Sequence, residues 1–526
     1  MTSSLFRGRP RHATSRISVR VLHTLVGGLA GVVWLVLPWM TINSDAPVPV
    51  TRAHQTAASA AAAEQDGTSA ADLVLPLVVV AAAVVVAGYG YVRRTRRART
   101  RTTPGGAAAP AGPAAPPLSE LDERVRALLV EADDCVRTSR EELEFAEARS
   151  GADPVAPFVR AVRGAESELS AAFRMRQQYD DGVPDDETSR RHALAGMVGR
   201  CQEAGRRLDA EAAGFDLLRA LGTADGLGAA LEVAEDRFRA LAARTGGAEA
   251  TLAGLGRRYG TSAVEAVTGH VEQAKDRLVF ATTRLNQARQ TADMEEREDA
   301  ARHLRAAEGA TAQADVFVSG IERLAADLAS AAKLVPAALT GAEAELAGAR
   351  AAGTDAGDIP AGELHARAAH AHLVLAAVRE ELTAGPYDPL DALRLIVRGL
   401  APVGVGRAGV LSVAASLVAR SAVADADAFV TTHRGAVGST ARTRLAEAER
   451  LLTDEPPDLL TADTLARRAR ERAEQDVRVH GNPITGTAEH ETGVAGAVLG
   501  GVLVAGSSAS YGGPHTRARR GRGSAL

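Results

Sequence analysis

Residues 264–288, VEAVTGHVEQAKDRLVFATTRLNQA, carry the clearest structural pattern in the chain. Apolar side chains recur at alternating spacings of three and four for nearly four heptads, which predicts a coiled-coil seam of about 37 Å. The seam positions are Val264, Val267, Val271, Ala274, Leu278, Ala281, Leu285 and Ala288. Alanine at alternate positions permits close approach of the backbones, which favours antiparallel packing of long helices over a parallel zipper.

The same spacing extends to other parts of the chain. One such stripe begins at Leu118 and reaches Cys135, and another runs from Leu194 to Leu208 through Cys201. Both cysteines therefore lie at apolar seam positions, where a core role is favoured over a reactive or metal-binding one. Two cysteines without C-x-x-C spacing exclude a disulfide framework. Ser119, with Asp122 three residues later, predicts a capping-box start for the first of these helices.

Glycine and proline clusters divide the helical pattern into segments. These clusters lie at residues 153–154, 182–184, 222–226, the three glycines at 254, 256 and 260, 353–360, 385–389 and 456–457. Short connections between long helices favour antiparallel neighbours. No stretch shows period-2 alternation between hairpin turns. We therefore predict an all-α fold in which residues 118–480 form a long antiparallel helical, coiled-coil region.

Composition excludes little by itself. The 526 residues carry 61 basic and 65 acidic side chains, a formal net charge of −4, so global charge identifies no partner. Aromatic residues make up only 3% of the chain, which favours helical seams of small side chains over a thick aromatic core.

Two apolar stretches near the N-terminus predict membrane spans. Residues 21–40 follow a basic segment, residues 1–20, and have the length of a span. This stretch is either a signal peptide or a signal anchor, and the anchor is favoured because no good A-x-A cleavage site follows it. Residues 41–72 form a short extracytoplasmic segment, and the uncharged residues 73–92 predict a second, transmembrane helix.

An arginine run fixes the expected topology. Its members, directly after the second span, are Arg93, Arg94, Arg96, Arg97, Arg99 and Arg101. Because positive residues stay on the cytoplasmic side, we expect an integral protein of the cell membrane with its C-terminal region in the cytoplasm. The same arginines can contact membrane lipid. The rest of residues 93–117 is a Pro/Ala/Gly linker.

The C-terminal residues 481–526 predict a Gly-rich, basic, disordered tail. Its last arginines follow His515, and Tyr511 is the only aromatic residue near them, so there is no stacking platform for specific nucleic-acid binding.

Three motifs contain residue types that can support chemistry. Gly404, Gly406 and Gly409 match the spacing of a dinucleotide-binding loop, but no strands accompany them, so a hinge between helices is favoured. Three histidines on one predicted helix cannot converge on a metal; they are His365, His370 and His372. Asp425 and Asp427 are the ordinary acidic pair of a helix face or cap. We predict no catalytic, cofactor-binding or metal-binding residues.

Four segments resemble the cytoplasmic half of actinobacterial membrane proteins that contain a TPM domain. The segments are residues 272–290 (EQAKDRLVFATTRLNQARQ), 172–181, 387–393 and 431–437. The resemblance implies a signal peptide, an extracytoplasmic α/β TPM domain, a membrane span, a long helical region and a Gly-rich tail. Phosphatase-like activity and metal-binding acidic residues belong to the TPM domain. Residues 41–72 are too short to contain that domain, so no phosphatase residue is carried over.

These features together predict a membrane-anchored, non-catalytic helical scaffold or interaction protein of the bacterial cell envelope. Its partner would be another protein or a second copy of the chain, bound through the helices. The alternative is a truncated relic or helper of a TPM-type phosphatase-like membrane protein. Turnover of a phosphate ester by the full chain would discriminate between the two.

Overall fold

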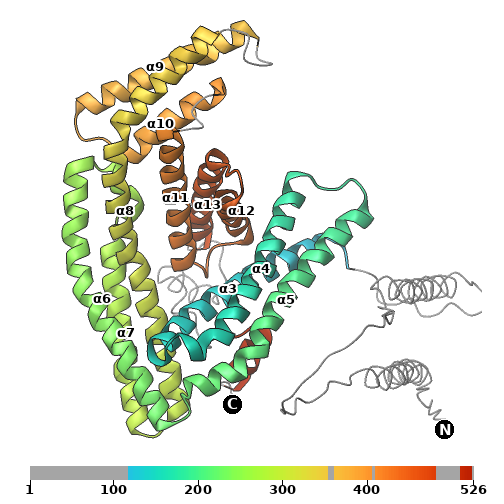
Figure 1. Cartoon of the computed structure of the whole chain (residues 1–526). Helices are drawn as coiled ribbons and strands as arrows, with labels where there is room; N and C mark the ends of the chain where they lie inside the picture. Colours follow the sequence, from blue (N-terminus) through green and yellow to red (C-terminus); the bar gives the residue numbers. More distant parts are fainter. Residues whose placement is uncertain (1–115, 353–359, 405–408, 481–509, 524–526) are drawn as a thin grey trace, which may run out of the picture. The chain divides into compact units, whose positions relative to one another are not determined.

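A computed structural model describes residues 116–352, 360–404, 409–480 and 510–523 (Figure 1). The chain divides into two units, Met1–Ala111 and Gly112–Leu526, and the described residues all belong to the second unit. The two predicted membrane spans and the arginine run lie outside the described residues. Within the described ranges every regular element is a helix, which confirms the all-α prediction for that part of the chain.

The first three helices pack around one apolar core. They are α3 (Leu118–Ser150), α4 (Ala152–Asp181) and α5 (Glu187–Arg219). Gly151 alone separates α3 from α4, and its φ of 79° is a conformation that glycine adopts without a steric penalty. Both cysteines are buried here, Cys135 in α3 and Cys201 in α5. Burial raises the pKa of each thiol to about 12, so both are protonated at neutral pH.

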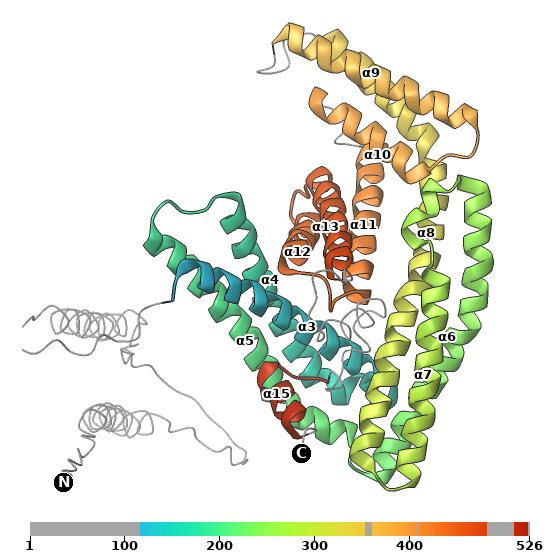
Figure 2. The same cartoon turned by 180° about the vertical axis from the view of Figure 1, so that it is seen from behind.

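Three long helices run side by side in both views of the molecule (Figures 1 and 2). They are α6 (Ala224–Tyr259), α7 (His270–Asp293) and α8 (Arg297–Ala352), and the 56 residues of α8 make it about 84 Å long. The part of the seam from Val271 to Ala288 is buried between α7 and its neighbours. The first two seam residues instead belong to the 3-10 helix η2 (Ser262–Val267), because Gly269, at φ 82°, interrupts the chain before α7.

The remaining helices of the body follow α8 in the chain. They are α9 (Ala361–Ala384), α10 (Pro389–Leu400), the short η4 (Ala401–Val403), α11 (Gly409–Thr432), α12 (Ser439–Thr453) and α13 (Leu459–His480). Of these, α9, α10 and α11 pack against α8, and α12 and α13 pack against α11. Helices α8 to α11 share one apolar core, and α11 to α13 share another. The first helix of the body begins at Leu118, and α13 ends at His480.

Side-chain caps explain where three helices begin. The side chains of Asp186, Thr223 and Asp388 accept hydrogen bonds from the first N–H groups of α5, α6 and α10. The expected capping box at Ser119 was wrong, because α3 starts at Leu118 and no side chain caps it. The glycines at 254 and 256 do not break α6, which continues to Tyr259.

Helix α11 has the length and composition of a membrane span, the only described helix that does. This property is weak evidence for membrane association, because the core helix of a soluble domain passes the same test. In this structure α11 packs against α8, α10, α12 and α13, and eleven of its residues are buried. Its Asp425 is paired with Arg470 of α13. We therefore interpret α11 as a core helix of the bundle.

The expected disorder of the C-terminal tail does not extend to residues 510–523. The chain there forms a turn and then helix α15 (Pro514–Gly523), which lies against α5 and α3 (Figure 2). The reason is local: Tyr511, Gly512 and Gly513 fit tightly against the first three helices, so this part of the tail has a buried apolar anchor.

Candidate functional site

The strongest candidate site is the groove between α3, α4 and α5 that holds residues 510–520. We call it the tail groove, and we define it by Ser139 and Glu142 of α3, Phe158 of α4, and Gly205, Asp209, Phe215 and Asp216 of α5. The groove thus binds a polypeptide segment that follows the body by about thirty residues in the sequence.

Tyr511 is the anchor of the bound segment. Its side chain is fully buried, and its ring stacks on Phe215 with the ring centres 4.3 Å apart. The ring also meets the edge of Phe158 at 5.9 Å, and its hydroxyl donates to the carbonyl oxygen of Phe158 at 3.3 Å. Burial raises the pKa of the phenol, so Tyr511 stays neutral and its apolar ring and polar tip are both accommodated.

Glu142 receives the backbone of the bound segment. The N–H of Tyr511 donates to Oε2 of Glu142 at 2.5 Å, and Arg305 of α8 donates to Oε1 of the same carboxylate at 3.2 Å. Burial alone would raise the pKa of Glu142, but Arg305, Arg219 and the Tyr511 N–H together hold it below its ordinary value. The carboxylate is therefore charged when it accepts this bond, which makes the bond a strong one.

Glycines on both sides of the contact allow the backbone of the segment to approach α5 closely. A Cβ on Gly513 would lie 2.2 Å from the carbonyl oxygen of Gly205, and a Cβ on Gly205 would lie 2.7 Å from Cδ of Pro514. Gly512 has a φ of 131°, and its N–H donates to Oγ of Ser139 at 3.2 Å. A side chain on Gly513 or Gly205 would therefore collide with atoms across the groove, and Gly512 adopts a φ that favours glycine, so the contact is selective for two consecutive glycines in the segment.

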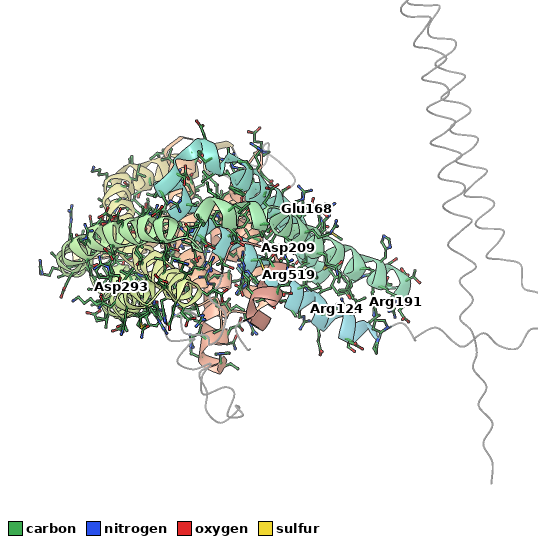
Figure 3. All side chains as sticks on the ribbon, turned by 90° about the horizontal axis from the view of Figure 1, so that it is seen from below. Arg124, Glu168, Arg191, Asp209, Asp293 and Arg519 are labelled. Carbon is green, nitrogen blue, oxygen red and sulfur yellow. The ribbon has the colours of Figure 1, made fainter. Side chains whose placement is uncertain are left out.

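Helix α15 adds polar contacts to the outer side of the groove. The N–H of Thr516 donates to Oδ1 of Asp209 at 2.9 Å, and Arg520 donates to Oδ2 of Asp216 at 2.5 Å. Arg517 donates to the carbonyl oxygens of Asp134 and Cys135, each at 3.3 Å. Figure 3 labels Asp209 and Arg519 where α5 and α15 meet, and Arg519 itself is exposed. Arg517, Arg519 and Arg520 of this helix thus differ in role.

A buried charge pair lies beneath the tail groove. Arg219, at the end of α5, is 2% exposed and donates to both carboxylate oxygens of Glu308 in α8 at 2.8 Å. Its Nε lies 3.7 Å from Oε1 of Glu142. The tail groove is therefore connected through Glu142 to the charges that join α5 to α8.

A second buried network joins α3 to the C-terminal helices. Arg442 of α12, 2% exposed, donates to Asp133 at 2.6 Å and to Asp134 at 2.7 Å. Arg137 of α3 donates to Asp133 and, at 2.7 Å, to Asp427 of α11. Burial would raise the pKa of Asp133, but the two arginines lower it overall, so the aspartate is ionised. These ion pairs hold the halves of the body together.

A polar cavity of about 570 Å³ lies between α8, α10, α11 and α13. Some of its charged side chains pair with each other, as Arg470 with Asp425 and Arg394 with Asp391, both at 3.1 Å. His270 lines this cavity, and burial with nearby Arg470 lowers its pKa to about 3. Seven acidic and four basic side chains line the cavity, so its polar wall is net acidic and its ion pairs do not balance all of its charges.

The histidines and glycines that the sequence offered as candidates for chemistry do not form a common site in the described residues. His365, His370 and His372 are all exposed on α9. Gly404 and Gly409 follow helix α10 and precede helix α11, without a strand beside them, and residues 405–408 lie outside the described residues. Within the described ranges, no group of three or more His, Cys, Asp or Glu side chains is placed to hold a metal ion.

The tail groove was missed at the sequence level, although one signal for it was present. Tyr511 is an aromatic residue in a Gly-rich segment, directly before Gly512 and Gly513. An isolated aromatic beside a Gly-Gly-Pro turn is an anchor for docking on a preformed surface, but no local pattern reveals where that surface lies.

Comparison with known proteins gives relatives whose names state no activity. Two curated proteins of Mycobacterium tuberculosis, from strains CDC 1551 / Oshkosh and H37Rv, are each described as a UPF0603 protein. Each is 29% identical to this chain over 417 residues, which cover 74% of this chain and 62% of the relative. The chain thus spans less than two thirds of the curated relatives it matches. No family model and no solved structure matches it.

Proposed function

We propose that this chain is a membrane-anchored, non-catalytic helical interaction protein of the bacterial cell envelope, with its helical body in the cytoplasm. The observation that carries the proposal is the tail groove, in which the body binds a polypeptide segment through an aromatic anchor, a charged acceptor and a glycine contact. The apolar residues 21–40 and 73–92 and the arginines after them support the membrane anchor.

The recognition part is tested with a peptide. A fluorescent peptide of residues 508–526 is added to the full chain in lipid nanodiscs, either wild type or with Gly513→Ala, whose own tail cannot dock. We expect the variant to bind the peptide at least about tenfold tighter than wild type, because the wild-type groove is already filled. A peptide that itself carries Gly513→Ala should not bind, whereas His515→Ala, at an exposed position, should leave binding intact. Equally weak binding of every peptide to both forms of the full chain would contradict the proposal.

The membrane topology is tested by labelling single introduced cysteines in whole cells. Ser59→Cys lies between the two expected spans, and Ala243→Cys lies at an exposed position of α6. An impermeant maleimide should label only the first in intact cells and both after lysis. The native cysteines are buried and serve as the background control. Labelling of Ala243→Cys in intact cells would contradict a cytoplasmic body.

A second candidate is a relic or helper of a TPM-type phosphatase-like membrane protein. The partial coverage of the relatives supports it, since 62% of their length is matched and the rest carries parts that the alignment does not include. Metal-dependent hydrolysis of a phosphate ester by the purified full chain would favour this candidate over a non-catalytic protein.

A further inference from the structure

We propose that the tail groove also binds residues 510–520 of a second copy of this chain, so that two copies associate by exchanging their C-terminal segments. The inference rests on the proposed role of the body as a peptide-binding module, and it adds the identity of the partner.

The first step is that the groove discriminates by sequence. Tyr511 is fully buried against Phe215, Gly513 passes the backbone carbonyl of Gly205 on α5 with no room for a Cβ, and Gly512 has a positive φ of 131°. Arg520 then pairs with Asp216. A partner must therefore present an aromatic residue followed by two glycines, and each copy of the chain carries that sequence.

The second step is that every contact is preserved in an exchange. Tyr511 meets the same Glu142, Phe158 and Phe215 whichever copy supplies it, because none of these groups belongs to the segment itself. Exchange of an identical element between copies therefore creates no new interface that must be stabilised. Docking within one copy and docking between two copies differ only in entropy: the first restricts the connecting chain, and the second also requires two copies to associate.

The chain that joins the segment to α13 is long enough to let the segment reach the groove of a neighbouring copy. The segment is joined to α13 by residues 481–509, which are 29 residues. A chain of that number spans at most about 100 Å when fully extended, which exceeds the length of the longest helix in the body. Anchoring of both copies in one membrane would raise the local concentration of each segment near its neighbour's groove.

The experiment co-expresses two differently tagged full chains in the same cells, one with Asp216→Cys and the other with Arg520→Cys. These positions form an ion pair across the groove, with 2.5 Å between Arg520 Nη2 and Asp216 Oδ2. A short bismaleimide is added to membranes, and products are separated by size. We expect a cross-linked dimer that carries both tags. A chain with both cysteines is the control for docking within one copy and should also form an internal cross-link.

Matched variants in the chain that bears Arg520→Cys make the test specific. Gly513→Ala should reduce the dimer about tenfold or more, because it blocks entry into the groove without touching the body. His515→Ala, at an exposed position of the same helix, should leave the dimer unchanged. Absence of the mixed dimer, while the doubly substituted chain cross-links internally, would overturn the exchange. The peptide-binding result would stand in that case, so failure of the exchange and failure of the proposed function are distinguishable. A dimer insensitive to Gly513→Ala would also overturn it.

Discussion

The backbone N–H of Tyr511 donates a 2.5 Å hydrogen bond to Glu142, a residue 369 positions earlier in the chain. Glu142 also accepts a bond from Arg305 and lies near Arg219, so one carboxylate joins the C-terminal segment to α3, α5 and α8. These partners keep Glu142 ionised. The docked tail therefore contributes to the same network that stabilises the helical body.

Tyr511→Ala should release the C-terminal segment. The change removes a fully buried ring and should weaken docking by roughly 3 kcal/mol, about a hundredfold. Release frees the backbone of α15 around its arginines, so trypsin should cleave at Arg517 and Arg519 much faster than in wild type. His515→Ala is the matched control, and cleavage at the wild-type rate in both variants would argue against the anchor role.

Gly205→Ala should separate docking from stability of the body. Alanine is favoured over glycine in a helix by about 1 kcal/mol, so the substitution strengthens α5. Its Cβ would lie 2.7 Å from Cδ of Pro514, so the tail should be displaced. Gly199→Ala, on the same helix with no atom within 4 Å of its Cβ, should give the helix gain with the tail still protected from trypsin. Identical behaviour of the two variants would contradict the close glycine contact.

Arg442→Ala should destabilise the body strongly. The arginine is buried with Asp133 and Asp134, so its removal leaves uncompensated buried charge and should cost about 3–5 kcal/mol. Arg126→Ala breaks an exposed ion pair to Asp122 and should cost less than about 1 kcal/mol. Chemical denaturation followed by circular dichroism measures both, and a small effect at Arg442 would show that this network does not hold the helices together.

Stability of the body should fall as the pH drops below about 6.5. Burial lowers the pKa of His270 to about 3 and of His433 to about 4, from an ordinary 6.5. Between these values the unfolded chain binds protons that the folded chain does not, so lowering the pH favours unfolding. From pH 6.5 to 5, each imidazole should account for about 2 kcal/mol of lost stability.

The double variant His270→Gln/His433→Gln isolates this contribution. Its free energy of unfolding should depend less on pH over the same range than that of wild type, whatever its absolute stability. His372→Gln, at an exposed position of α9, should keep the wild-type slope. An unchanged slope in the double variant would mean that the two histidines are not buried in neutral form.

The sequence predicts the helices better than it predicts how they meet. The seam residues between Val271 and Ala288 recur with the period of a buried helix face, and the structure buries all of them. The apolar spacing continues through Gly269, although the backbone there has a positive φ and is not helical. Spacing alone cannot reveal such a single-residue break. Gly254 and Gly256 remain helical because packing of α6 on α7 and α8 outweighs their weak helix propensity.

The tail groove could not be derived from local pattern. Phe158, Phe215 and Tyr511 lie in three separate segments, and each taken alone is an ordinary apolar residue. Gly512 and Gly513 predict flexibility by composition, whereas in contact with α5 the same lack of a side chain makes a close fit. Only the folded arrangement of α3, α4 and α5 converts these residues into a binding site.

Hydrogen–deuterium exchange of residues 510–523, measured on the full chain in lipid nanodiscs, tests the central claim most directly. The amides of Tyr511, Gly512 and Thr516 donate to Glu142, Ser139 and Asp209, so we predict exchange slowed by at least about a hundredfold relative to an unstructured peptide of the same sequence. Gly513→Ala should remove the protection. Exchange at the rate of the free peptide in the wild-type chain would contradict the binding of this segment by the helical body.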